Sequence, residues 1–216
     1  MRPDLSSLLT TLKPRNTPVF TGLSTEDLAS GSFSLPSGAI TEISGALSSG
    51  RTSFIHAILA RATAAGECCA MVDSAGAFDP WSAAQAGVDL QKLLWVRASG
   101  RLDAALKAAD LILHSGGFGV IVLDLCEASA QDLNRIPLSY WYRCRGAVEN
   151  TPGRFVVASH VPLAKSCARL PLETRRASVQ WTGTQWTGST AFFNGIDFAV
   201  QDRKPHAQQQ PTSLAG

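Results

Sequence analysis

The stretch that decides the fold of this chain is Gly45-Ala46-Leu47-Ser48-Ser49-Gly50-Arg51-Thr52. It follows an apolar run at 39–43 and precedes an apolar-periodic segment at 54–65, so it connects a strand to a helix. Its two glycines allow the backbone to curl, and the N–H groups of the curl then point toward phosphate oxygens at the positive end of the helix. The spacing G-x-x-x-x-G-R-T in this context predicts a phosphate-binding loop.

One position of this loop departs from the usual pattern. Arg51 stands where a lysine normally reaches the β and γ phosphates of a nucleotide. Lysine is a compact point charge, whereas arginine is a longer planar fork, so the two are not interchangeable. We therefore expect a vestigial site with weak affinity for ATP and Mg²⁺, or no required cofactor, at the loop residues Gly45, Ser48, Ser49, Gly50, Arg51 and Thr52.

A second nucleotide-site pattern lies further along the chain, where the apolar run at 119–123 ends in Asp124. An acid at the end of such a strand orients Mg²⁺ or its water beside the phosphate loop. Thr52 can add a hydroxyl ligand, so Thr52 and Asp124 are the candidate Mg²⁺ ligands if a nucleotide binds. Alone, the pattern also fits a buried strand that ends in Asp at a turn.

The overall composition is that of one folded domain. The chain has 216 residues, 45% of them hydrophobic, and a net charge of +2 that is too small to indicate nucleic-acid binding by itself. It contains no apolar run of about 18 residues, so no membrane span is expected, and its first residues are unlike a signal peptide. The cysteines lack metal-binding spacing and suggest reduced thiols in a cytoplasm; they are Cys68, Cys69, Cys126, Cys144 and Cys167.

Strand and helix patterns alternate through the middle of the chain. Strands are expected at 40–44, 68–73, 94–97, 120–125 and 155–159, and helices at about 52–65, 80–86, 101–115 and 137–149. This alternation predicts an α/β fold with a mainly parallel sheet flanked by helices. Two later segments, 178–181 and 192–200, are expected as antiparallel edge strands. The predicted parts are an N-terminal arm and linker at 1–20, the α/β domain at 21–200 and a disordered tail at 201–216.

Two surface features are candidates for binding. A short predicted helix carries an apolar stripe that would dock on a partner or on a second copy of the chain, formed by Leu5, Leu8, Leu9 and Leu12. In the helix expected at 137–149, aromatic rings flanked by cations are candidate contacts for single-stranded DNA, namely Trp141 with Tyr142, Arg143 and Arg145. For this second feature we favour the alternative, an amphipathic helix whose aromatic face packs on the sheet.

The order of these motifs resembles the bacterial RecA family over about residues 20–182. The segments that carry the resemblance, besides the phosphate loop, are Leu35–Ile43, Asp73–Pro80, Gly87–Leu90 with Leu93-Leu94, and Arg176–Val179. The resemblance implies a RecA-like phosphate-loop domain. It also implies that a glutamate which activates the attacking water should stand at Ala75, and alanine cannot accept a proton. The two segments that correspond to the DNA-binding loops of RecA, 126–137 and 159–165, are short.

A narrower resemblance is carried by Leu94–Arg97, Leu106–Asp110, Gly116–Gly119, Ile136–Ser139 and Ala147–Pro152, together with the Gly-Arg-Thr-Ser ending of the loop. These segments are similar to ImuA, the RecA/SulA-like family of the bacterial damage-inducible mutagenesis cassette. That resemblance implies a scaffold or regulator in error-prone translesion synthesis. Its implied partners are an error-prone replicative-type polymerase and an inactive relative of the Y-family polymerases.

The expected function is therefore a non-catalytic or weakly catalytic RecA-like adaptor in the DNA damage response, located in the cytoplasm. Loss of the acid at Ala75 and of the lysine at Arg51 together disfavours an enzyme. Four alternatives stay open at this point: a DNA-dependent ATPase, a DNA-binding RecA paralogue, a regulator that binds RecA itself, and, through the SulA link, an inhibitor of cell division.

Overall fold

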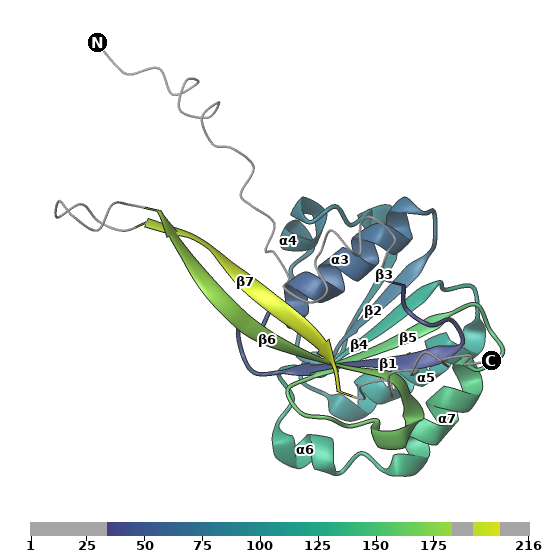
Figure 1. Ribbon diagram of the computed structural model, residues 1–216. Helices are drawn as coiled ribbons and strands as arrows, with labels where there is room; N and C mark the ends of the chain where they lie inside the picture. Colours follow the sequence, from purple (N-terminus) through teal and green to yellow (C-terminus); the bar gives the residue numbers. More distant parts are fainter. Residues whose placement is uncertain (1–33, 183–191, 204–216) are drawn as a thin grey trace, which may run out of the picture.

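The computed structural model describes residues 34–182 and 192–203 of the chain, and its centre is one twisted sheet (Figure 1). The strands lie in the order β3-β2-β4-β5-β1-β6-β7, and every neighbouring pair except β6 with β7 is parallel. This confirms the predicted α/β fold. The strands are β1 (Ala39–Gly45), β2 (Cys69–Asp73), β3 (Leu93–Arg97), β4 (Val120–Asp124), β5 (Arg154–Ser159), β6 (Ala168–Thr182) and β7 (Phe192–Asp202).

Helices cover both faces of the sheet (Figure 1). One face carries α3 (Arg51–Ala64) and α4 (Pro80–Gln85); the other carries α5 (Leu102–Ser115), α6 (Ala130–Asn134) and α7 (Leu138–Val148). Two short 3-10 turns, η1 (Leu90–Lys92) and η2 (Lys165–Cys167), precede β3 and β6. None of the described helices is both long enough and apolar enough to cross a lipid bilayer.

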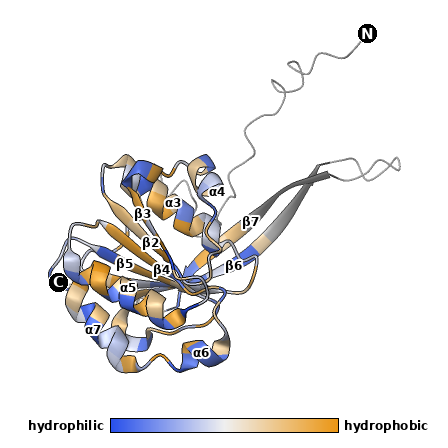
Figure 2. Ribbon diagram, turned by 180° about the vertical axis from the view of Figure 1, so that it is seen from behind, coloured by the Kyte–Doolittle hydropathy of each residue, from blue (hydrophilic) through white to orange (hydrophobic). Residues whose placement is uncertain are grey.

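The side chains of the central strands alternate between two cores, as the period of a strand requires. In β4, Val120 and Val122 pack beneath α3, whereas Ile121 and Leu123 pack beneath α5 and α7. A parallel strand covered on both faces must be apolar on both sides, which explains the continuous Val-Ile-Val-Leu run. The apolar colour of β2, β4 and β5 in Figure 2 shows the same pattern across the middle of the sheet.

The end of the sheet near β6 differs from the sequence prediction. β6 begins at Ala168 rather than at 178, and its first part, up to Thr174, pairs in parallel with β1. At this end of the sheet β7 is the edge strand and β6 is an inner strand. β7 continues to Asp202, beyond the predicted start of the tail at 201. Together β6 and β7 form a long antiparallel hairpin that projects away from the rest of the sheet (Figure 1).

A buried carboxylate ties this end of the sheet together. Glu42, in β1, is fully buried, and its Oε1 atom accepts hydrogen bonds from the backbone N–H groups of Leu163 and Ala164 at 2.5 and 2.7 Å. Its other oxygen pairs with Arg203, which follows β7. The carboxylate of Glu42 therefore connects β1 with the loop between β5 and β6 and with the residue that follows β7.

The N-terminal arm with its stripe Leu5, Leu8, Leu9 and Leu12 lies outside the described residues, as does the tail from 204. All five cysteines lie within the described part, and none of them forms a disulfide there. Three of them are buried packing residues, whereas Cys68 is exposed and Cys126 is partly exposed.

Candidate functional site

The loop between β1 and α3 has the curled backbone that a phosphate-binding loop needs. Ser48 and Gly50 both have left-handed backbones, with φ of 59° and 88°. Gly50 is the N-cap of α3; no side chain caps this helix end, and its first turn carries no acid. The first turn of α3 therefore carries no acidic side chain of its own, which favours an anionic ligand at this helix end.

Both glycines of the loop are required because other side chains press against them. A Cβ atom on Gly45 would lie 2.4 Å from Oγ1 of Thr174, and one on Gly50 would lie 2.4 Å from the ring of Phe198. Thr174 belongs to β6 and also shares a hydrogen bond of 2.7 Å with Oγ of Ser49. The hairpin of β6 and β7 thus holds the loop in shape from outside.

The loop borders a cavity of about 350 Å³, a size within the range of about 300–1,000 Å³ usual for ligand sites. Its lining contains most of the predicted site residues: Ser48, Ser49, Gly50, Arg51, Thr52 and Asp124. Gly45 does not line the cavity, and it serves the close packing against Thr174 instead. Strand β5 lies between β1 and β4, so Asp124 reaches the loop across one strand rather than from the neighbouring one.

Arg51 is the central charged group of this cavity. Its side chain is only 6% exposed, and its Nη1 atom is buried with no hydrogen-bond partner among the described residues. The positive charge of Arg51 acts to lower the pKa of the Asp124 carboxyl. The described part of the chain nevertheless contains no salt bridge between the two side chains. Arg51 and Asp124 therefore line the same cavity without forming an ion pair.

Asp124 itself is held by the backbone that follows it. Its Oδ1 atom accepts a hydrogen bond of 2.9 Å from the N–H of Cys126. Burial raises the pKa of the Asp124 carboxyl above its ordinary value, and nearby Asp73 acts in the same direction. The bond from Cys126 and the charge of Arg51 oppose this change in pKa without cancelling it.

These residues do not fit a bound Mg²⁺ ion well. Thr52 and Asp124 do line the same cavity, as the predicted metal site requires. Magnesium needs oxygen ligands and prefers ionised carboxylates, however, and the unpaired group here is a buried guanidinium, which only donates. The guanidinium of Arg51 cannot serve as a metal ligand, and burial raises the pKa of Asp124, which disfavours the ionised carboxylate that Mg²⁺ prefers, so we derive no step through Mg²⁺.

The turn after β2 contains Ala75, the position at which the resemblance to RecA implies a catalytic glutamate. The buried carboxylate of Asp73 accepts hydrogen bonds from four successive backbone N–H groups, those of Ala75, Gly76, Ala77 and Phe78, at 2.7 to 3.2 Å. Ala75 is exposed and does not line the cavity. Asp73 is thus a structural anchor for this turn, and the turn supplies no proton acceptor at Ala75.

Three ring side chains complete the cavity, and sequence reasoning did not select them: His56, Phe78 and Phe198. The rings of His56 and Phe78 meet edge to face, with centroids 5.8 Å apart. Burial lowers the pKa of His56, so it contributes a neutral ring near pH 7. His56 lies one helical turn after Thr52, a spacing that could have identified it. No local signal connects Phe198 to the loop.

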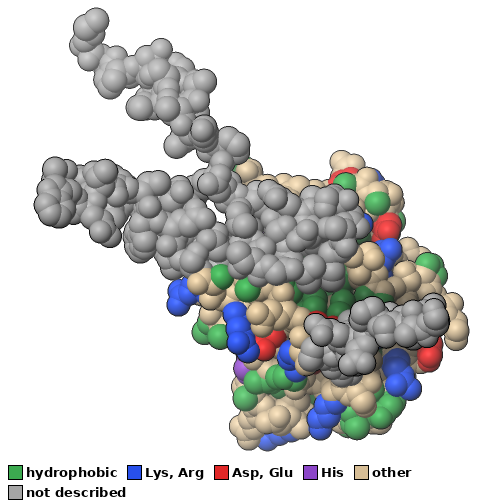
Figure 3. Space-filling model, in the orientation of Figure 1, with side chains coloured by type: hydrophobic (Ala, Val, Ile, Leu, Met, Phe, Trp, Pro, Cys, Tyr) green, Lys and Arg blue, Asp and Glu red, His purple; other side chains and the backbone are tan. Residues whose placement is uncertain are grey.

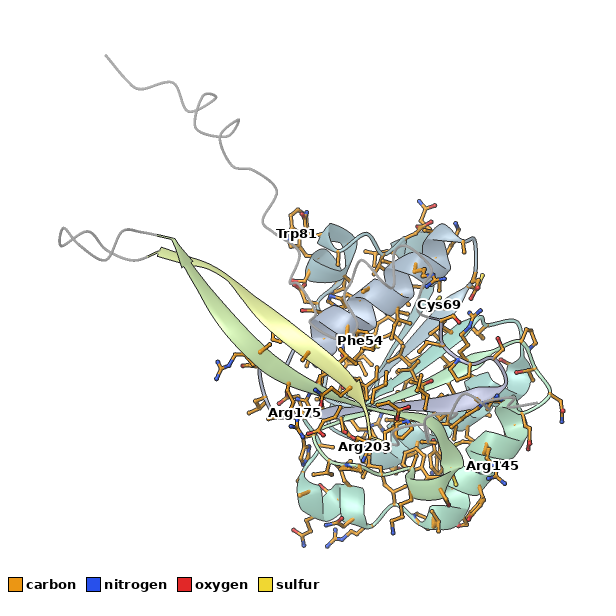
Figure 4. All side chains as sticks on the ribbon, viewed as in Figure 1. Phe54, Cys69, Trp81, Arg145, Arg175 and Arg203 are labelled. Atoms are coloured by element: carbon orange, nitrogen blue, oxygen red, sulfur yellow. The ribbon has the colours of Figure 1, made fainter. Side chains whose placement is uncertain are left out.

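The candidate DNA contacts on α7 are only partly available. Trp141 is 1% exposed and packs in the core edge to face with Tyr140, so its ring is not accessible for stacking on bases in this structure. Arg143 is exposed but pairs with Asp110 at 2.9 Å. Arg145 lies on the outer side of α7 (Figure 4), and its guanidinium carbon is 5.2 Å from the centroid of the exposed Tyr142 ring. This outcome agrees with the favoured amphipathic helix.

Charge on the visible surface gives no strong sign of a nucleic-acid groove. Figure 3 shows Lys and Arg side chains dispersed over the described part of this face, among acidic and uncharged groups. A nucleic-acid groove usually gathers its cations along one track. The described surface in this view therefore offers single cations rather than a continuous basic path.

Comparison with known proteins agrees with this geometry. Residues 10–132, more than half of the chain, match the RecA N-terminal domain family. Over 110 residues the chain is 41% identical to protein RecA of Acinetobacter baylyi and 40% identical to protein RecA of Acinetobacter baumannii. These alignments cover 51% of this chain but only 31% of each relative.

A solved structure extends the likeness in fold beyond this aligned region. The structure described as the RadB recombinase superposes with a TM-score of 0.52 at 16% identity, covering 70% of this chain and 82% of that chain. At this identity the likeness concerns the fold alone. The family match, the collinear relatives and the phosphate loop between β1 and α3 lead to one conclusion: the chain belongs to the RecA N-terminal domain family.

Proposed function

We propose that this chain is a RecA-family adaptor that does not hydrolyse ATP and acts in damage-induced, error-prone DNA synthesis. The observation that carries the proposal is a phosphate loop kept in shape while its catalytic partners are absent. The loop retains its left-handed backbone at Gly50 and its packing against β6. Ala75 stands where an acid would activate water, and the carboxylate of Asp73 accepts hydrogen bonds from four backbone N–H groups.

The chain retains the RecA-like fold but lacks the residues for ATP hydrolysis. This combination suggests that the fold is kept for a binding surface rather than for catalytic turnover. General-base catalysis contributes typically about 10²–10⁴-fold to a rate, so losing the base removes most of an ATPase's advantage. The short connection between β5 and β6, clamped by Glu42, also leaves little room for a mobile DNA-binding loop. Both features favour an adaptor over a recombinase.

The partners in this proposal come from the resemblance to the mutagenesis-cassette family. They are an error-prone polymerase and the inactive Y-family polymerase relative, with RecA itself or a second copy of the chain as further candidates. The relatives compared above are named protein RecA, and the aligned region spans less than a third of their length. Direct binding of DNA is expected to be weak or to occur through the partners.

A complementation assay in the native host tests the proposal. Cells without this chain are treated with a DNA-damaging agent, and the frequency of induced mutations is scored after complementation with wild type or with an Asp124→Ala variant. We expect deletion to lower the frequency and both forms to restore it, because hydrolysis is not required. Homologous recombination between marked chromosomal alleles is the control and should be unchanged by the deletion.

Two results would contradict the adaptor role. A deletion that lowers recombination but leaves induced mutation intact would indicate a recombinase accessory protein instead. Restoration by wild type but not by stably produced Asp124→Ala would show that nucleotide chemistry at the cavity is needed, and would favour the ATPase alternative.

A further inference from the structure

A cavity of about 690 Å³ lies at the edge of the sheet opposite the phosphate loop. Its lining includes the places where the chain enters four parallel strands, at Ser37 before β1, Cys68 before β2, Gly119 before β4 and Arg154 at the start of β5. It shares no described lining residue with the cavity at the phosphate loop. Its size is within the range of about 300–1,000 Å³ usual for binding sites, and the adaptor proposal does not account for it.

The floor of this cavity is apolar. Leu113, Ile121 and Val148 belong to the core beneath α5 and α7, and they line the cavity together with the partly buried Phe118. The turn at Gly116 and Gly117 forms part of the rim, where an added Cβ atom would meet nothing within 4 Å. A concave surface that is mainly apolar, with a few polar groups at its edge, is typical of a binding site.

The charged groups of the cavity are already paired with each other. Its described lining contains one acid and one base, Glu67 and Arg154, whose Oε2 and Nη1 atoms are 2.8 Å apart. An occupant that carried a charge would break this pair or add a third, uncompensated charge, and both are costly in a partly buried place. The cavity therefore favours an occupant that is apolar or neutral and polar.

The segment that follows β7 is directed toward this edge of the sheet. β7 runs antiparallel to β6, and the N–H of Arg203 donates to the carbonyl of Pro171, which is in register with Glu42 in the middle of β1. A chain that continues in this direction approaches the amino end of β1. Strand β5 lies three strands from β7, about 14 Å away. Residues 204–216 span up to about 40 Å when extended, so they can reach the cavity.

The composition of this segment also suits the cavity. Residues 205–216 contain no Asp, Glu, Lys or Arg, and they include Leu214. Their Gln, Ser and Thr side chains can form hydrogen bonds with backbone groups of the glycine turns. The N-terminal segment 1–33 fits less well, because it carries both acidic and basic side chains. It also joins the domain at Ser34, which lines a smaller cavity of about 160 Å³.

We propose that residues 204–216 fold back along the amino-terminal edge of the sheet and occupy this cavity, with Leu214 against Phe118 and the apolar floor. The cavity is then a binding site for the chain's own C-terminal segment. Another protein that uses this face must first displace the segment. The inference goes beyond the proposed function and does not depend on whether the chain hydrolyses ATP.

Thiol labelling tests this contact, because Cys68 is exposed and lines the cavity, whereas Cys126 lies at the phosphate loop. The full-length chain and a chain that ends at Arg203 are treated with iodoacetamide, and the alkylation rate of each thiol is followed by mass spectrometry of its peptide. We expect removal of residues 204–216 to speed the alkylation of Cys68 by about tenfold, the factor that burial of one leucine side chain contributes. The rate at Cys126 is the internal control and should not change.

Two variants assign the protection of Cys68 to the leucine. Leu214→Ser should speed the alkylation of Cys68 nearly as much as the truncation does, because it removes the apolar anchor. Gln209→Ser is the matched control, since it changes the same segment without removing an apolar group, and its rate should stay near that of wild type. The truncated chain keeps Arg203 and its ion pair with Glu42, and circular dichroism with thermal unfolding checks that it is folded.

Cross-linking identifies the occupant. With a short bismaleimide reagent, the thiol of a Ser213→Cys variant should become linked to Cys68 of the same chain, as mass spectrometry of the peptides would show. A Ser24→Cys variant, in the N-terminal segment, is the comparison and should not be linked to Cys68.

The proposal is overturned if Cys68 reacts as fast in the full-length chain as in the truncated one, which is the result that a disordered tail would give. It is also overturned if the cross-link joins two chains, because a second copy would then supply the occupant. Preferential linkage of the Ser24→Cys variant would assign the cavity to the N-terminal segment instead.

Discussion

The contact between Gly50 and Phe198 allows a quantitative test of how β7 supports the phosphate loop. Substitution Gly50→Ala places a methyl group in a backbone with φ of 88°, 2.4 Å from the Phe198 ring. The left-handed backbone costs about 1–2 kcal/mol for a residue with a Cβ atom. The overlap adds about 1–3 kcal/mol, the usual range for an overpacked core. We expect a total loss of about 2–5 kcal/mol in the free energy of unfolding.

Gly66→Ala is the matched control, because Gly66 has the same φ of 88° but nothing within 4 Å of an added Cβ. It should cost only the backbone term of about 1–2 kcal/mol. Urea unfolding followed by circular dichroism measures both. In a Phe198→Ala background, Gly50→Ala should cost no more than Gly66→Ala does. Equal losses for the two single variants, or an undiminished loss in the Phe198→Ala background, would refute the contact between β7 and the loop.

Three further predictions concern other parts of the chain. Asp124→Asn should be more stable than wild type at pH 7 but not at pH 3. Burial raises the pKa of Asp124 in the folded state, so the stability of wild type falls as the pH rises through and above the unfolded pKa of about 3.9. Unfolding measured at several pH values checks this. Glu42→Ala should lose about 3–5 kcal/mol, measured by urea unfolding, because Arg203 and two backbone N–H groups lose their partner; a loss below about 1 kcal/mol would contradict the buried clamp. Deleting residues 1–13 should abolish self-association or capture of the polymerase partners in light scattering and pull-down assays; unchanged assembly with lowered thermal stability would make that segment ordinary core cover.

The alternating core was predictable because its signals are local. The strand expected at 120–125 is β4 at Val120–Asp124, and the helix expected at 101–115 is α5 at Leu102–Ser115. Apolar runs bounded by glycine and turn residues carry this information within a few positions. The missed helix α6 is short and has no apolar period, although Ser129 and Asp132 form a capping pair at its start.

β6 was misjudged for a different reason. Its first part contains Pro171 and the charged Glu173, and Arg175 follows directly; these residues argue against an inner strand. Pro171 is tolerated because β6 pairs with β7 only from Leu172 onward. The charged pair is tolerated because Arg175 projects outward (Figure 4) and pairs with Glu173 at 3.0 Å. Pairing with a strand more than a hundred residues earlier leaves no local mark on the sequence.

The site shows the same division. The loop from Ser48 to Thr52 and Asp124 were found from spacing alone, and they line one cavity. The burial of Arg51 and the approach of Phe198 to Gly50 depend on tertiary packing, which no local spacing encodes. Trp141 was ambiguous because a ring next to arginines suits both a core and a base platform, and only its burial decides between them.

The most direct test of the central claim is steady-state release of phosphate from ATP by the purified full-length chain, with and without single-stranded DNA. The exposed alanine at position 75 and the buried arginine at position 51 predict turnover at the background rate under both conditions. A rate that single-stranded DNA stimulates, and that disappears in the Asp124→Ala variant, would show a working ATPase and contradict the account.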